Sequence, residues 1–82
     1  MSSKPKTQEK IKFDIHTGIK LRNKRVERKK TQERVAKVLN VTFQQVQKYE
    51  KGVNGLSGFH ILQLSEFFKV PVTYFFEGFN VR

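Results

Sequence analysis

The chain has 82 residues, no cysteine, and 17 Lys and Arg against 7 Asp and Glu, which gives a formal net charge of +10 at pH 7. This length suits one small domain with one modest core, and the absence of cysteine excludes disulfides and thiolate metal sites. Neither a signal peptide nor an apolar run long enough to cross a bilayer stands out, so we expect a cytoplasmic protein without membrane contact.

The positive charge is confined to one part of the chain. Residues 1–51 hold 15 of the 17 Lys and Arg and 5 of the 7 Asp and Glu, whereas the charges of residues 52–82 cancel. A one-sided positive field attracts a polyanion and speeds its capture, so nucleic acid is the expected partner. An anionic membrane surface is disfavoured, because no segment pairs a basic helical face with an exposed Trp, Phe or Leu face.

Residues 1–13 form a basic arm. The arm contains four lysines, one proline and few apolar residues, so we expect it to be disordered when free. It could lie along DNA phosphates or serve only as a solubilising tail, and its composition fits both roles. The folded domain is expected to span residues 14–82.

The first helix is expected over residues 14–29, with Leu21 and Val26 as its clearest core positions. A basic run, which extends from Arg28 to Lys30, closes it. Cations stabilise the C-terminal end of a helix, so this run has a structural explanation as well as a DNA-binding one.

Residues 31–51 read as two helices joined by a sharp turn. Thr31 is a favoured N-cap for the first of them, which carries a narrow apolar stripe of Val35, Ala36 and Leu39. Asn40 suits the turn, because Asn takes the left-handed conformation at low steric cost, and Thr42 can cap the second helix. This is the layout of a helix-turn-helix, whose second helix enters the major groove of DNA.

The second helix of the motif, residues 43–51, has two unlike faces when its residues are placed about 100° apart. Val46 lies at the centre of the buried face and Tyr49 lies beside it. The opposite face carries amides and cations without any acid: Gln44, Lys48 and Lys51, with Gln47 at the flank. Gln can bond adenine with both ends of its amide, and Lys can reach guanine or a phosphate.

Two residues of this helix are ambiguous. Phe43 could pack beneath the start of the helix or touch a thymine methyl group. Glu50 turns inward and needs a partner if it is buried, and Arg25 on the preceding helix is the candidate. A buried ion pair would hold the two helices together, whereas the alternative is that both side chains are exposed.

The C-terminal part is rich in aromatic residues. A helix is expected from Ser57 or Gly58 to Phe68, and a short last helix over residues 72–76 that begins after Pro71. Several apolar side chains fall outside the core face and would be costly to leave in water. We expect them to form a dimer surface made of Phe59, Leu62, Phe67 and Phe79, the alternative being that all of them fold inward.

Signals for chemistry are weak. His16 and His60 stand alone, without the spacing of a metal or nucleophile motif, and the five glycines form no phosphate-binding pattern. We therefore expect no enzymatic activity, no metal site and no cofactor.

Four stretches together resemble the Cro and lambda-repressor-like (XRE-type) family of helix-turn-helix regulators: DIHTGIKLRNKR, TQERVAKVLNV, QQVQKYEKGVN and ILQLSEFFKVPVTYFF. The shared motif has a Gln at the start of its first helix, an Ala five positions into the motif, an apolar residue after the turn and a YExG ending. The resemblance implies a compact, all-α, five-helix domain. It also implies sequence-specific binding to double-stranded DNA, usually as a two-fold homodimer.

The resemblance assigns roles by position. It makes Gln44 and Lys48 the best base readers, and Gln32 a phosphate contact that also supports the reading helix. It makes Thr31, Gln45, Gln47, Lys51 and Asn54 secondary contacts. With Phe43 and Thr42 added from the residues themselves, we expect further base contacts from Gln47 and Phe43, and further phosphate contacts from Thr31, Thr42, Gln45, Lys51 and Asn54. It also makes Arg25 with Glu50 a structural ion pair.

The chain departs from the family pattern in three places. Asn40 replaces the usual turn Gly, and Gly55 stands where relatives often carry a basic residue. The side chains of Phe59, Leu62 and Phe67 are more apolar than usual, which favours an unusual interface.

These features predict a transcriptional regulator, most simply a repressor that occludes a promoter. An alternative of another class is a protein-binding module, such as an antitoxin that neutralises a toxin and regulates its own gene. A third is the controller of a restriction-modification system.

Overall fold

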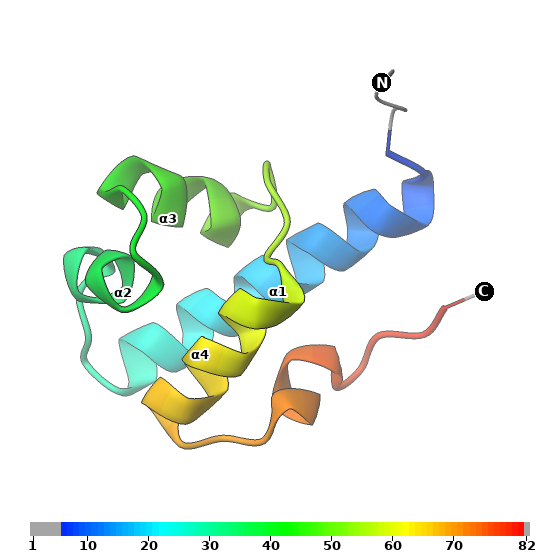
Figure 1. Cartoon of the computed structure of the whole chain (residues 1–82). Helices are drawn as coiled ribbons and strands as arrows, with labels where there is room; N and C mark the ends of the chain where they lie inside the picture. Colours follow the sequence, from blue (N-terminus) through cyan, green and yellow to red (C-terminus); the bar gives the residue numbers. More distant parts are fainter. Residues whose placement is uncertain (1–5, 82) are drawn as a thin grey trace.

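The computed structural model describes residues 6–81. These residues form four α-helices and one short 3-10 helix (Figure 1). Residues 6–81 contain no strand, so the predicted all-α class is confirmed. The predicted fifth helix is present as the 3-10 segment. The elements are α1 (Gln8–Glu27), α2 (Gln32–Leu39), α3 (Phe43–Lys51), α4 (Gly58–Phe68) and η1 (Val72–Phe76).

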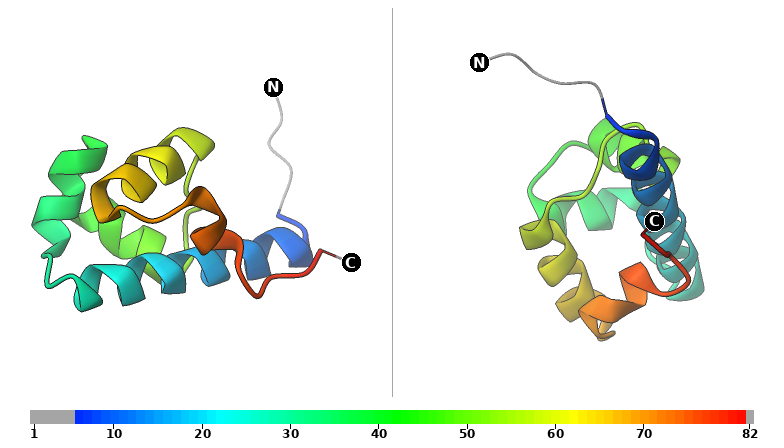
Figure 2. Two further views of the ribbon diagram at one scale, coloured as in Figure 1. Left: turned by 90° about the horizontal axis from the view of Figure 1, so that it is seen from below. Right: turned by 90° about the vertical axis from the view of Figure 1, so that its right-hand side faces the viewer.

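The long helix α1 supports the rest of the domain. Both α3 and η1 pack against it, α2 packs against α3 and α4, and α4 packs against η1. Figure 2 shows α1 along one edge, with the other helices on one side of it. The side chains buried between these helices are Leu21, Val35, Ala36, Leu39, Val46, Tyr49, Leu56, Ile61, Leu64, Phe68 and Phe75.

The start of α1 corrects the expected boundary of the arm. We predicted a helix from residue 14, whereas α1 begins at Gln8, so residues 8–13 belong to the folded domain. Thr7 caps the helix, because its hydroxyl accepts a hydrogen bond from the Lys10 amide at 3.1 Å. Phe13 then stacks on Phe76, with 5.9 Å between ring centroids. The expectation for residues 1–5 lies outside the described residues.

The end of α1 also differs from the prediction. The helix ends at Glu27, because Lys29 adopts a left-handed conformation with φ of 57° and stops it. Leu21 is fully buried as predicted, but Val26 is 54% exposed, so its assignment to the core was wrong. The helix has little amphipathic character, since Ile15 and Ile19 are exposed as well.

Asp14 joins the start of α1 to the rest of the domain. Its carboxylate is almost fully buried, and Lys6 and Lys10 form ion pairs with its two oxygens. Burial by itself raises the pKa of the Asp14 carboxyl, but hydrogen bonds from Lys10 and Lys6 outweigh it and hold the pKa below its ordinary value. Lys6 also donates to the carbonyl oxygen of Val53, at 3.2 Å, in the loop after α3.

A glycine lets α1 and α3 approach each other closely. Gly18 lies in the middle of α1 and is buried. A Cβ atom at this position would collide with the carbonyl oxygen of Tyr49 and would lie 2.9 Å from that of Glu50. Both carbonyls belong to the last turn of α3, so the missing side chain of Gly18 sets how deeply α3 sits on α1.

Candidate nucleic-acid interface

Local chemistry fixes where α3 begins and ends. Asn40 takes the left-handed conformation, with φ of 56°, and ends α2 as predicted. The Thr42 hydroxyl then caps α3 by accepting a hydrogen bond from the Gln45 amide at 3.1 Å. Gly52 ends α3 with φ of 76°. The turn between α2 and α3 is therefore held by residues within or next to it, as expected for a helix-turn-helix.

The two faces of α3 are those predicted from the helical wheel. Val46 and Tyr49 are buried, while Gln44, Lys48 and Lys51 are exposed and Gln47 is half-buried. The single acid of α3, Glu50, is buried on the inner side. The exposed face is thus neutral or cationic along its whole length, and Figure 1 shows α3 lying at the outer edge of the molecule.

Phe43 is half-buried at the first position of α3. Its ring is therefore neither fully packed in the core nor fully exposed on the face of α3 that would meet DNA. The contact of Phe43 with a thymine methyl group therefore stays a prediction.

Glu50 organises the contacts that hold α3. Its carboxylate accepts hydrogen bonds from Arg25 Nε at 2.6 Å and Arg25 Nη2 at 3.1 Å, so the predicted ion pair forms with two-point geometry. Gln32 Nε2 donates to Glu50 Oε1 at 2.9 Å. Arg25 Nη1 reaches the carbonyl oxygen of Lys30, at 3.0 Å. One carboxylate therefore joins the end of α1, the start of α2 and the end of α3.

The remaining expected phosphate contacts lie near the ends of these helices. Thr31 caps α2 and Thr42 caps α3, so both hydroxyl oxygens already accept a backbone hydrogen bond and retain a proton to donate. Gln45 Nε2 bonds Asn54 Oδ1 at 3.0 Å, which ties the loop after α3 to the helix. Lys51 is exposed in the last turn.

The expected dimer surface does not form one patch. Phe59 and Leu62 are 67% and 56% exposed and lie three positions apart on α4, so they are neighbours. Phe67 instead packs against the core, and Phe79 lies 5.3 Å from the ring of Phe13. Contacts within the chain cover much of both rings, so the role of Phe67 and Phe79 in a dimer surface stays a prediction.

Sequence reasoning missed a second basic region. Arg28 and Lys30 come together with Lys69, around the rings of Phe67 and Phe68. The run from Arg28 to Lys30 was noticed in the sequence, but Lys69 is distant from it and carried no signal of its own. No helix within residues 6–81 has the length and apolar character to cross a membrane.

Comparison with known proteins agrees with this geometry. A family model described as Helix-turn-helix matches residues 21–75. Uncharacterized HTH-type transcriptional regulators of Sinorhizobium medicae and Sinorhizobium fredii are 42% and 44% identical to the chain, over 79% and 78% of its length and 47% and 45% of theirs. An uncharacterized transcriptional regulator in the ATPase CF(0) region of Rhodospirillum rubrum is 38% identical, over 77% of this chain and 58% of that protein.

The chain spans about half the length of the curated relatives it matches. The match nevertheless covers α2, the turn, α3 and α4 completely, together with the part of α1 that carries Arg25. These are the elements that build the two-faced helix and its supporting ion pair. The chain therefore belongs to the helix-turn-helix family, of the Cro and lambda-repressor-like (XRE) type.

Proposed function

We propose that this protein binds double-stranded DNA sequence-specifically and regulates transcription, most simply as a repressor that occludes a promoter. The observation that carries the proposal is the exposed face of α3, which presents two cations and an amide and has no acid. A face of this kind suits the major groove, where Gln reads adenine and Lys reads guanine. The relatives that are named transcriptional regulators support the same role.

The proposed contacts divide between bases and phosphates. Gln44 and Lys48 would read base edges, with Gln47 and Phe43 beside them. Gln32 would bond a phosphate while it holds Glu50, so it would couple the backbone contact to the position of α3. The other proposed phosphate contacts are Thr31, Thr42, Gln45, Lys51 and Asn54.

We propose that two copies bind together, with Phe59 and Leu62 contributing to their contact. The pair is exposed and apolar, which makes it a suitable centre for a small interface. A two-fold dimer would place its half-sites about 34 Å apart, which is one turn of DNA. Selection of bound sequences from random duplex DNA tests this directly, because symmetric half-sites would support both DNA reading and the dimer. Failure to enrich any motif would count against sequence-specific binding.

Lys48→Ala should relax base preference at one operator position. Loss of a base contact typically removes about 1–3 kcal/mol of discrimination, so the preferred sequence should lose about 5- to 150-fold in affinity. Competition across single-base operator variants measures the change. Lys37→Ala is the matched control, since Lys37 is an exposed lysine of α2 that lies outside the α3 face. An even loss over all sequences, with the salt slope reduced by about one, would instead make Lys48 a phosphate contact.

A protein-binding module of the antitoxin type is the second candidate. The exposed pair of Phe59 and Leu62 on α4 favours it, because a protein partner could cover this surface as well as a second copy could. Co-expression with the product of the neighbouring gene decides between the two. Co-purification that Phe59→Ser abolishes would favour the module, and a homodimer that loses its self-association with the same substitution would favour the regulator.

A further inference from the structure

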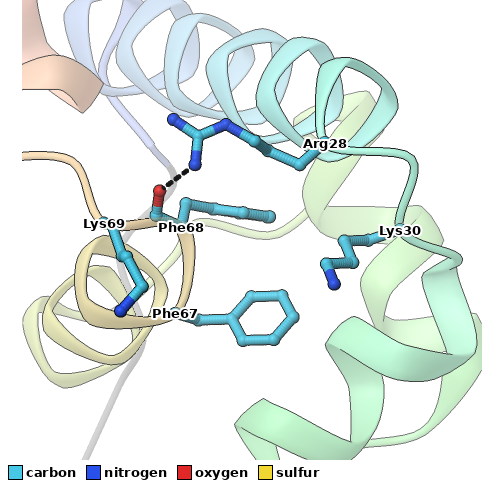
Figure 3. A pocket seen from close by; sticks show the side chains of 5 residues that line it. All are labelled: Arg28, Lys30, Phe67, Phe68 and Lys69. Carbon is cyan, nitrogen blue, oxygen red and sulfur yellow. Dashed lines mark hydrogen bonds between the residues drawn. The ribbon is translucent and has the colours of Figure 1, made fainter.

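A small pocket with basic walls lies where α1 and α4 end. Its volume is about 280 Å³, and it is lined by Arg28, Lys30, Phe67, Phe68 and Lys69 (Figure 3). Figure 3 shows these side chains arriving from three segments: the end of α1, the loop before α2, and the end of α4. A cavity of this size is at the lower end of small-molecule sites, so it suits one ring with one attached group.

The charge around this pocket has one sign. Three of its five lining residues are cations and none is an acid. Arg28 is held in place, because its Nη1 donates to the carbonyl oxygen of Phe68. Glu27 Oε2 lies 3.8 Å from Arg28 Nε, but Glu27 is exposed, so it offsets the charge of the Arg28 guanidinium only in part. The pocket therefore keeps an excess of positive charge beside a fixed guanidinium, which can still donate through its other N–H groups.

The pocket also has an aromatic wall. The ring of Phe67 packs against Phe68, with 5.0 Å between centroids. Lys30 Nζ lies 5.7 Å from the centre of the Phe67 ring, and the guanidinium carbon of Arg34 lies 5.4 Å from it. These cations lie over the Phe67 ring, and Phe67 also lines the pocket, so a negatively charged molecule with a ring would meet aromatic surface and positive charge together.

Lys69 occupies a backbone position where glycine would be less strained. It takes the left-handed conformation at the end of α4, with φ of 57°. Glycine adopts this conformation without the steric penalty that a side chain carries there. The chain therefore carries a cation beside the pocket at a position where glycine would have the lower backbone energy.

We propose that this pocket binds a small anion that carries an aromatic ring, with the ring against the part of Phe67 that lines the pocket and the anionic group near Lys30, Lys69 and Arg28. The site is separate from the proposed DNA-reading face: the C-terminal ends of α1 and α4 lie in the lower part of Figure 1, and α3 lies at the top. Binding at this pocket does not require that α3 reads DNA.

Titration of the whole chain with phenyl phosphate, followed by backbone and side-chain NMR, tests the proposal. Saturable shifts are expected at Phe67, Lys30 and Lys69, together with ring-current shifts on the Phe67 side chain. Benzoate should bind at the same place, which separates a general aromatic anion from a phosphate-specific site. Inorganic phosphate, which lacks the ring, and benzyl alcohol, which lacks the charge, should each bind at least about tenfold more weakly.

Variants make the test specific. Lys69→Gly should weaken phenyl phosphate binding about tenfold, because it removes a charged hydrogen-bond donor. It should also leave the fold intact or raise the unfolding temperature, since glycine relieves the left-handed backbone. Lys30→Gln should weaken binding similarly, while the Lys30 carbonyl remains available to Arg25. Lys12→Gln, at an exposed site on α1, removes the same charge elsewhere and should leave binding within about twofold.

Three results would overturn the proposal. Phenyl phosphate shifts that never saturate, or that spread over all lysines, would show only general attraction to a basic protein. An equal loss in Lys12→Gln and Lys69→Gly would show the same. Equal affinity for inorganic phosphate and phenyl phosphate would remove the role of Phe67.

Discussion

Glu50→Ala should strongly destabilise the protein. Its carboxylate accepts from Arg25 and Gln32, and its side chain is only 3% exposed. Removing one partner of a buried ion pair leaves the other charge without compensation, which typically costs about 3–5 kcal/mol. For a domain of this size the thermal midpoint should fall by more than about 10 °C, as measured by circular dichroism.

Two further variants test whether the loss of stability comes from the unpaired charge of Arg25 or from the removal of any acid. Glu66→Ala removes an exposed acid of α4 and should stay within about 0.5 kcal/mol of the parent protein. Exchanging both partners for Met should recover much of the lost stability, because no charge is then left buried. A double variant as unstable as Glu50→Ala would mean that Arg25 is not the cause of the loss.

Gly18→Ala should weaken the contact between α1 and α3. Alanine is the better helix former by about 1 kcal/mol, so the exchange would stabilise an isolated helix. Here the added Cβ meets the backbone carbonyl of Tyr49, which cannot turn away as a flexible side chain can. Overpacking of this kind costs about 1–3 kcal/mol, so we expect a net loss in denaturant unfolding together with weaker DNA binding.

Gly58→Ala is the matched control for this exchange. Gly58 is the first residue of α4, and a Cβ there would meet nothing within 4 Å. The same chemical change should therefore be neutral or slightly stabilising. If Gly18→Ala were equally harmless, the close approach of α3 to α1 would not depend on Gly18.

The sequence predicted the motif well because the signals that define it are local. Thr31, Asn40, Thr42 and Gly52 act on backbone groups within a few residues of themselves, so their types reveal their roles. The pairing of Arg25 with Glu50 was also accessible, because α3 carries a single acid and it falls on the inner side of the wheel.

The errors concern contacts between distant parts of the chain. The early start of α1 depends partly on Phe13 meeting Phe76, which no local pattern announces. Val26 is apolar at a helical spacing from Leu21, yet within residues 6–81 no neighbour covers it. In the sequence, Phe67 and Phe79 had no visible partner in the core. The residues that contact them come from distant segments: α1, the loop before α2 and the first turn of α2.

The network around Glu50 has a mechanical consequence. Three helices share one carboxylate through Arg25 and Gln32, so we expect α3 to move together with α1 and α2 and the domain to meet DNA as a stiff body. If the protein does not change shape on binding, the DNA duplex must deform to fit it. The ability of the duplex to bend and twist depends on its base sequence. Operator strength should then vary with base pairs that no side chain touches.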